Sequence, residues 1–142
     1  MKSGQSLIEL LIALGIFGVT VSVVTFLLIN GYLSDLQARQ NNIGIFLAEE
    51  GLEAVRSIRD NNWKDLKEGS YGLAIAGNHW ILTEEPEDIS AILNQGKRKI
   101  KIENIDKERK KITSEITWQI APIKKNKIEL VTYLTNWQKE IQ

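Results

Sequence analysis

Hydrophobic and polar positions follow three different patterns along this chain of 142 residues. Residues 10–29 carry no charged side chain, and a helix of about 20 apolar residues spans the roughly 30 Å hydrocarbon core of a membrane. Residues 30–59 repeat apolar positions at helical spacing, which predicts an amphipathic helix. Beyond Gly69, apolar and polar positions alternate, which predicts β-strands. The pattern predicts one long helix followed by a small domain of strands.

The amphipathic half of the helix has one stripe that should pack against the strands. Its members recur at intervals of three, four or seven residues and are Leu36, Gln40, Ile43, Leu47, Ala54 and Ile58. The run Asp60-Asn61-Asn62 favours a turn over a helix interior, so we expect the helix to end there.

The segment 63–142 predicts an antiparallel sheet with one solvated face, and the whole chain an α+β fold. Alternation places strands near residues 71–75, 80–82, 97–104, 112–120 and 128–135, with a turn at 76–79 and an acidic loop at 84–88. The chain has no cysteine, so strand pairing and apolar packing must hold the domain together. Four tryptophans are expected between helix and sheet: Trp63, Trp80, Trp118 and Trp137. The alternative for Trp137, which lies near the free end, is an adhesive group on the surface.

Glu9 is the one charged residue at the start of the apolar run. An ionisable group in a membrane costs about 2.5–3.5 kcal/mol at the bilayer centre on insertion scales. No Lys or Arg lies between Lys2 and Arg39, so the helix offers no cation one turn away. Glu9 should therefore find its partner on another molecule.

The N-terminal residues resemble a known export signal. Gly4, the run Leu7-Ile8-Glu9-Leu10-Leu11-Ile12, and the small residues Gly15 and Gly18 are similar to the class III signal sequence of type IV pilins and of the pseudopilins of type II secretion. The resemblance implies that a prepilin peptidase cuts between Gly4 and Gln5 at the cytoplasmic face, and that the new N-terminus, Gln5, is methylated. It also implies that Glu9 pairs with the amine of Gln5 on an adjacent copy, or with that of a different pilin, as the subunit joins a filament.

Physical chemistry agrees with this pairing. An α-amino group has a reference pKa of about 7.7–8.0 and is largely charged at neutral pH, so it can neutralise a buried carboxylate. The resulting organisation is a cleaved leader at 1–4, a transmembrane and assembly helix at 5–29, the amphipathic half of the same helix at 30–62, and the β domain at 63–142. The apolar helix has no proline, and in the family an unbroken helix is common in minor pilins and pseudopilins.

The charges that flank the apolar run predict the orientation of the chain. Lys2 precedes it and Asp35 is the first charge after it, so the positive-inside tendency places the N-terminus in the cytoplasm and the β domain outside. A secretory signal peptide is the competing interpretation, but no A-x-A-like site follows Ile29. The expected location is the plasma membrane, then a filament at the cell surface or in the periplasm. The expected partners are other pilin subunits, the prepilin peptidase and the assembly machinery.

Motifs for catalysis or metal binding are missing from the sequence. His79 is the only histidine, and the carboxylates Glu49, Glu50 and Glu53 have no Glu-x-x-His partner, so they are interpreted as a solvated or subunit-facing patch. The run 60–65 lacks the Gly and the distant Glu of a calcium loop. We expect no enzymatic activity, no cofactor and no metal. Two helix-surface ion pairs are expected from their spacing, Glu53 with Arg56 and Arg56 with Asp60.

Two alternatives to a structural subunit remain. Residues 97–111 hold eight basic side chains against three acidic ones, and a basic hairpin can contact the phosphates of DNA. A DNA-uptake or tip-adhesion module would then use Lys99, Lys101, Lys110 and Lys111, although lysines also protect exposed strand edges. The other alternative is a membrane-anchored domain that does not polymerise.

Overall fold

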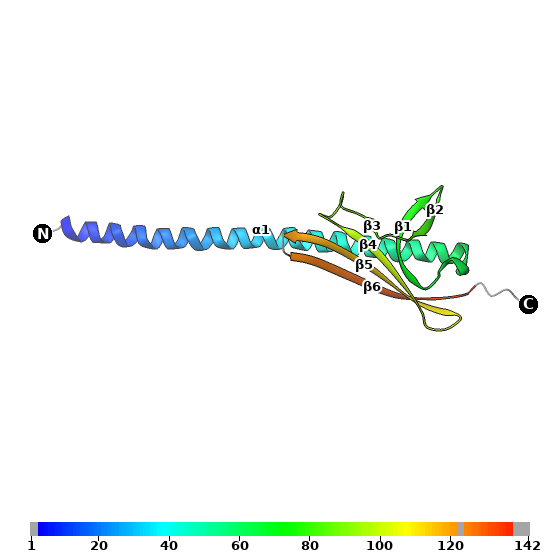
Figure 1. Cartoon of the computed structure of the whole chain (residues 1–142). Coiled ribbons are helices and arrows are strands. Elements are labelled where there is room, and N and C mark those ends of the chain that lie inside the picture. Colours follow the sequence, from blue (N-terminus) through cyan, green and yellow to red (C-terminus); the bar gives the residue numbers. More distant parts are fainter. Residues whose placement is uncertain (1–2, 122–123, 138–142) are drawn as a thin grey trace, which may run out of the picture. The chain divides into compact units, whose positions relative to one another are not determined.

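The computed structural model describes residues 3–121 and 124–137. It contains one long helix, α1 (Ser3–Asn61), and one short 3-10 helix, η1 (Trp63–Asp65). The strands are β1 (Gly69–Ala76), β2 (His79–Thr83), β3 (Glu87–Asp88), β4 (Lys97–Asn104), β5 (Arg109–Ala121) and β6 (Lys124–Thr135) (Figure 1). The predicted α+β class and the end of the helix near Asp60 are both confirmed. The chain divides into two compact units, residues 1–39 and 40–142.

The described part of the first unit consists of α1 alone, and it is long and apolar enough to span a membrane. Its apolar side chains are exposed throughout. Three polar side chains in this run bond to the helix itself: Thr20, Ser22 and Asn30 each donate to the carbonyl four residues earlier, at 2.8 Å. These groups are therefore satisfied without water, which suits an apolar environment.

The sheet of the second unit is antiparallel and has the order β2-β1-β4-β5-β6. The short β3 pairs with the first two residues of β4, Lys97 and Arg98. Five of the strands fall where alternation predicts them, although β5 and β6 are longer than expected. The short β3 was not predicted, because it lies in the segment expected to be an acidic loop. The β1–β2 hairpin turns at Gly77, whose φ of 64° favours glycine. Since β6 ends the order, one of its edges is unpaired within the described residues.

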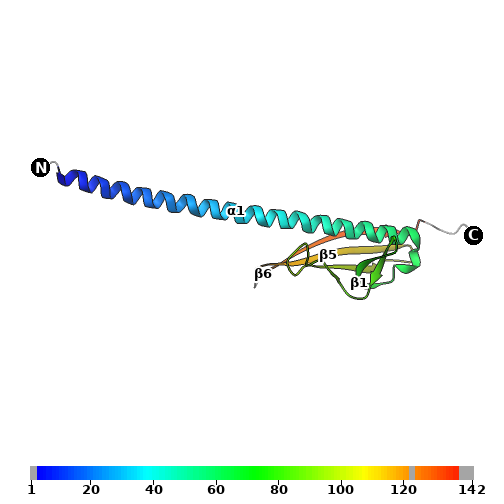
Figure 2. The same ribbon diagram turned by 90° about the horizontal axis from the view of Figure 1, so that it is seen from above.

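The sheet lies along one side of the second half of α1 (Figure 2). Two apolar clusters fill the space between them, one around Leu52, Val55 and Ile58, the other around Leu47 and Trp118. The predicted stripe is correct for Leu47, Ala54 and Ile58, but Leu36 and Ile43 are exposed. The true contact face also includes two glycines, Gly44 and Gly51, which a search for apolar residues overlooks.

The four tryptophans do not all occupy the interface predicted for them. Trp118 is 1% exposed, and Trp63 and Trp80 are partly buried against the first cluster. Trp137 is 61% exposed, and its Nε1 donates to Asp60 Oδ1 at 3.2 Å. The prediction that Trp137 packs between helix and sheet is wrong, because Trp137 lies beyond the end of β6.

Gly51 allows α1 to approach the sheet closely. A Cβ at this position would lie 2.6 Å from Ser114 Oγ, 3.2 Å from Ile100 Cδ1 and 3.3 Å from Arg98 Cδ. The Ser114 hydroxyl is fully buried and has no hydrogen-bond partner within the part of the chain that the structure describes. A larger residue at Gly51 would therefore force Ser114 or the helix to shift.

We expect Gly51→Ala to lower the free energy of unfolding by about 1–3 kcal/mol, the usual cost of overpacking a core. Ser114→Ala removes the atom that the new methyl group would meet, so the double variant should recover much of that loss. Urea unfolding of the full chain in detergent, followed by tryptophan fluorescence, measures both changes. Equal destabilisation of the single and double variants would contradict the proposed clash.

Candidate functional site

Glu9 lies in the first unit, on a part of α1 that is otherwise apolar. Its side chain is exposed, and it borders a shallow hollow shared with Ile8, Ile12, Ala13 and Ile16. No Lys, Arg or His occurs in residues 3–38, so this part of the helix supplies no cation. A membrane would surround the carboxylate with hydrocarbon, where an unpaired charge is costly, and this part of the helix has no cation to pair with it.

The predicted cleavage site coincides with the first turn of α1. Gly4 and Gln5 both belong to the helix, whereas Met1 and Lys2 lie outside the described residues. Gln5 and Glu9 are four positions apart, so they lie on the same side of the helix, one turn from each other. A cut before Gln5 would place a new amine at the end of the helix on the side that carries Glu9.

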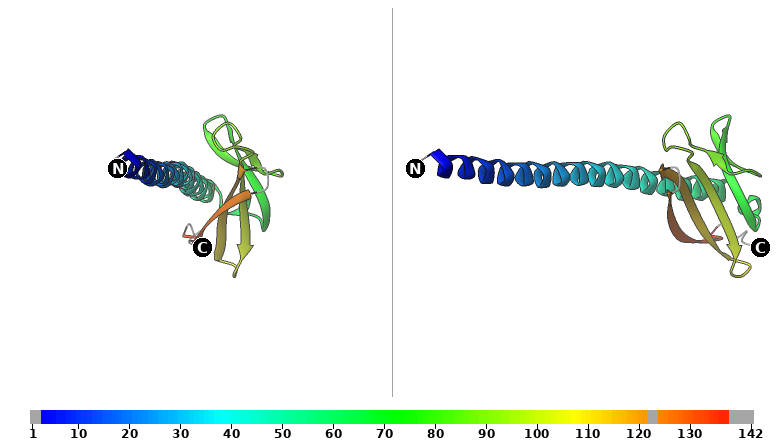
Figure 3. Two further views of the ribbon diagram at one scale, coloured as in Figure 1. Left: turned by 90° about the vertical axis from the view of Figure 1, so that its left-hand side faces the viewer. Right: turned by 60° about the vertical axis from the view of Figure 1, so that its left-hand side comes forward.

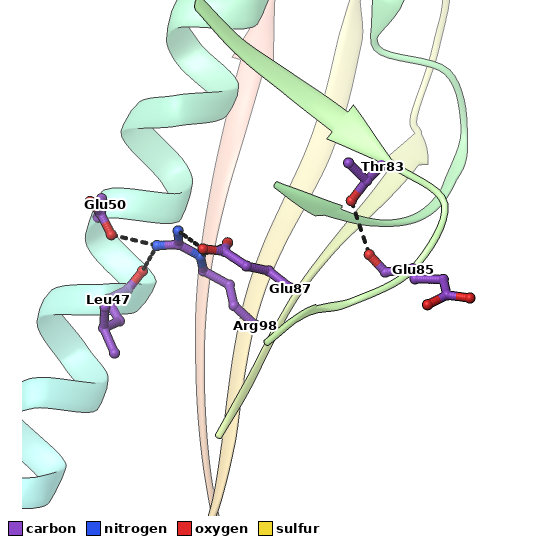
Figure 4. A network of polar contacts seen from close by, with 6 residues as sticks. All are labelled: Leu47, Glu50, Thr83, Glu85, Glu87 and Arg98. Atoms are coloured by element: carbon purple, nitrogen blue, oxygen red, sulfur yellow. Dashed lines mark hydrogen bonds and ion pairs between the residues drawn. The ribbon is translucent and has the colours of Figure 1, made fainter. Parts of the chain in front are cut away.

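The second unit contains a buried arginine that the sequence analysis did not single out. Arg98 on β4 is 2% exposed and forms a two-pronged ion pair with Glu87, with Nε–Oε2 and Nη2–Oε1 distances of 2.7 and 2.9 Å. Its Nη1 donates to Glu50 Oε2 at 2.6 Å and to the carbonyl oxygen of Leu47 at 3.0 Å. Figure 4 shows the guanidinium between α1 and the segment that carries Glu87.

The surroundings of Arg98 keep it charged. Burial acts to lower its pKa, but the hydrogen bonds to Glu87 and Glu50 outweigh burial, and the net pKa is raised above the ordinary value. The guanidinium carbon also lies 5.8 Å from the centre of the Trp80 ring, within the range of a cation–π interaction. Arg98 thus fastens α1, β3 and β4 to one another.

This network corrects the interpretation of the acidic residues. Glu50 is not simply part of a solvated patch, because it pairs with Arg98, while Glu49 and Glu53 are exposed. A signal for Arg98 was present in the sequence: alternation along β4 places it on the same face as Ile100 and Ile102. A cation on an apolar face predicts buried carboxylate partners.

The four lysines proposed for nucleic-acid binding do not share one surface. Strand register places Lys99, Lys101 and Lys111 on the sheet face that points away from α1, and Lys110 on the opposite face. The Nζ of Lys110 donates a hydrogen bond to the carbonyl oxygen of Leu66 and lies 4.9 Å from the centre of the Trp63 ring. Lys110 therefore helps to hold η1 against the sheet.

Carboxylates neutralise part of the remaining basic surface. Glu103 pairs with Lys101 at 2.9 Å and with Lys111 at 3.2 Å, and these hydrogen bonds hold the pKa of Glu103 below its ordinary value. Lys127 on β6 pairs with Glu115 and Glu129 in the same way. The outward face is a ladder of opposite charges across adjacent strands, which stabilises the sheet.

The remaining candidates from the sequence are His79, a possible metal site and two predicted ion pairs. His79 is exposed where the β1–β2 turn meets β2. The described residues contain no group of three or more His, Cys, Asp or Glu side chains that could hold a metal ion. The Glu53–Arg56 pair is confirmed, but the Arg56–Asp60 pair is wrong, because Asp60 bonds to Arg59 at 2.8 Å.

Comparison of the chain with protein-family models, with curated proteins and with solved structures gave no match.

Proposed function

We propose that this chain is a structural subunit of a type IV pilus-like filament, as a minor pilin or pseudopilin. It is inserted in the membrane by the first part of α1, with the second unit outside the cytoplasm. A prepilin peptidase removes residues 1–4, and the subunit then leaves the bilayer for a filament of similar subunits. The chain itself performs no catalysis in this role.

One observation supports this proposal above all others: a single carboxylate, Glu9, on a membrane-length apolar helix, five residues after Gly4. A plain membrane anchor gains nothing from a charge at this position, since the charge only raises the cost of insertion. A subunit that assembles gains specificity from it, because a buried carboxylate accepts only a partner that brings a cation. The amine created before Gln5 is such a cation.

The second unit also suits this role. Its sheet covers only one side of the amphipathic part of α1. Outside the buried contact, this part of α1 keeps large exposed apolar residues such as Phe46 and Ile43, and exposed apolar surface of this kind is typical of contacts with other subunits. A filament would bury this surface.

The division of the lysines between two faces gives no support to the DNA-binding alternative, so we propose no such function. A non-polymerising anchor remains the main competitor, and the mature N-terminus separates the two. We expect mass spectrometry of the membrane-extracted chain to find a chain that begins at Gln5 and carries one methyl group on its α-amine. An intact Met1, or a cut after Ile29, would refute the proposal.

A further inference from the structure

A groove lies between the second half of α1 and the open edge of β6. It has a volume of about 610 Å³ and is lined by Phe46, Glu49, Glu50, Leu52, Glu53, Arg56, Leu130 and Val131. Phe46 and Val131 are 67% and 48% exposed, although both are large apolar residues. Of the three carboxylates in this lining, Glu50 pairs with Arg98 and Glu53 with Arg56, whereas Glu49 has no ion pair within the described residues. An occupant should therefore bring an apolar side chain together with positive charge.

The β4–β5 turn of the same chain has both properties. Ile105 is 48% exposed, and Lys107, two residues further on, is exposed as well. Of the four basic side chains in residues 105–111, Arg109 pairs with Asp106, Lys111 pairs with Glu103, and Lys110 bonds to the Leu66 carbonyl. Lys107 has no ion pair within the described residues. Figure 3 shows the turn, drawn in yellow, at one end of the sheet, far from the β1–β2 hairpin.

This turn is also held in a fixed conformation. Asp106 Oδ1 accepts hydrogen bonds from the backbone N–H groups of Glu108 and Arg109 at 2.8 and 2.7 Å, and its Oδ2 pairs with Arg109 Nε at 2.7 Å. The hydrogen bond from Arg109 is the main cause of the lowered pKa of Asp106. A loop ordered in advance loses little entropy on binding.

Other exposed features of the second unit match the groove less well. The segment 90–96 exposes Ile92 but holds no cation, and the β1–β2 turn holds no Lys or Arg. The outward sheet face has lysines, but carboxylates alternate with them across its strands. Among these described surfaces, the β4–β5 turn alone joins an exposed apolar side chain, Ile105, to a nearby exposed lysine that has no ion pair within the described residues.

We propose that the groove between α1 and β6 receives the β4–β5 turn of a second copy of this chain. Ile105 of that copy packs against Phe46 and Val131, and Lys107 faces Glu49. The proposal rests on the proposed filament function and deepens it. The two surfaces are different parts of one molecule, so the contact is head-to-tail, and such contacts extend into open filaments unless they close into a ring.

Cysteine cross-linking tests this contact, because the natural chain has no cysteine. The full chain would carry Glu49→Cys and Lys107→Cys together, be expressed in its source cells, and be oxidised mildly before denaturing electrophoresis. We expect a ladder of covalent oligomers, since each copy offers one half of the bridge to each neighbour. A disulfide requires Cα atoms about 4.4–6.8 Å apart, so the ladder reports close contact.

The matched control replaces Glu49→Cys by Lys99→Cys, on the outward sheet face, and should give no ladder. Each single variant should remain monomeric. Covalent dimers without larger species would show a two-fold contact and overturn the inference, as would a ladder equally strong in the Lys99→Cys control.

Two outcomes separate this inference from the proposed function. If the double variant enters sheared filaments at the wild-type level but forms no ladder, the groove contact is wrong and the filament role stands. If the ladder persists after Glu9→Ala is added, the groove contact stands, and assembly through Glu9 is wrong. If the chain enters no filament and forms no ladder, both proposals are overturned.

Discussion

Glu9→Ala should leave the chain in the membrane and remove it from filaments. The substitution makes the helix more apolar, so insertion is at least as favourable as before. The amine of the neighbouring Gln5 then has no counter-charge, and removing one member of a buried ion pair costs about 3–5 kcal/mol. Since each 1.4 kcal/mol is a factor of ten, the fraction of chain recovered in sheared filaments should fall at least about a hundredfold.

The matched variants identify which property of Glu9 matters. Glu9→Gln keeps the size and a hydrogen-bonding group but loses the charge, so it should fail almost as completely as Glu9→Ala. Glu9→Asp keeps the charge on a shorter side chain and should retain partial incorporation. Membrane fractionation of each variant provides the control for insertion. Normal incorporation of Glu9→Ala would disprove the assembly role of this residue.

Arg98→Ala should lower the free energy of unfolding of the second unit strongly. The change leaves a hole between α1 and β4 and removes four hydrogen bonds, to Glu87, Glu50 and the Leu47 carbonyl. The carboxylates that remain are partly exposed and can recover water, so we expect a cost of about 3 kcal/mol, at the lower end for broken buried pairs. Urea unfolding of the full chain in detergent measures it.

Two controls distinguish the buried ion network from strand effects. Lys99→Ala, one residue along β4 and on the outward face, should change the free energy of unfolding by no more than about 0.5 kcal/mol. Glu87→Gln keeps one hydrogen-bond acceptor for Arg98 and should cost about 1–2 kcal/mol. A loss at Arg98 no larger than that at Lys99 would contradict the role assigned to the network.

The spacing of apolar residues predicts much of the architecture, because it shows which face of a helix or strand is buried. The helix ends near Asp60 because asparagine and aspartate favour turns, and β4 and β5 alternate because one face of each covers α1. These features depend on residues adjacent in sequence. The residue pattern alone was therefore sufficient to predict the end of the helix and the alternation of these strands.

The features missed by the sequence analysis depend on residues far apart in the chain. Glycines at 44 and 51 form part of the buried helix face because Trp118 and Ser114 approach there, and a count of apolar residues ignores glycine. Arg98 is buried because Glu50 and Glu87 reach it from other elements. The split of the lysines follows from strand register, which places Lys110 opposite Asn104 on the helix side.

The central claim is that Glu9 meets the amine of Gln5 on another subunit, and carbodiimide coupling tests it most directly. A hydrophobic carbodiimide joins a carboxylate to an amine in contact with it, and mass spectrometry of filaments treated in this way identifies the joined peptides. We predict an amide between the Glu9 side chain and the N-terminal amine of a neighbouring subunit, seen as a covalent dimer on a denaturing gel. Carbodiimide-modified Glu9 without such a link, or a link only to Gln5 of the same chain, would contradict the account.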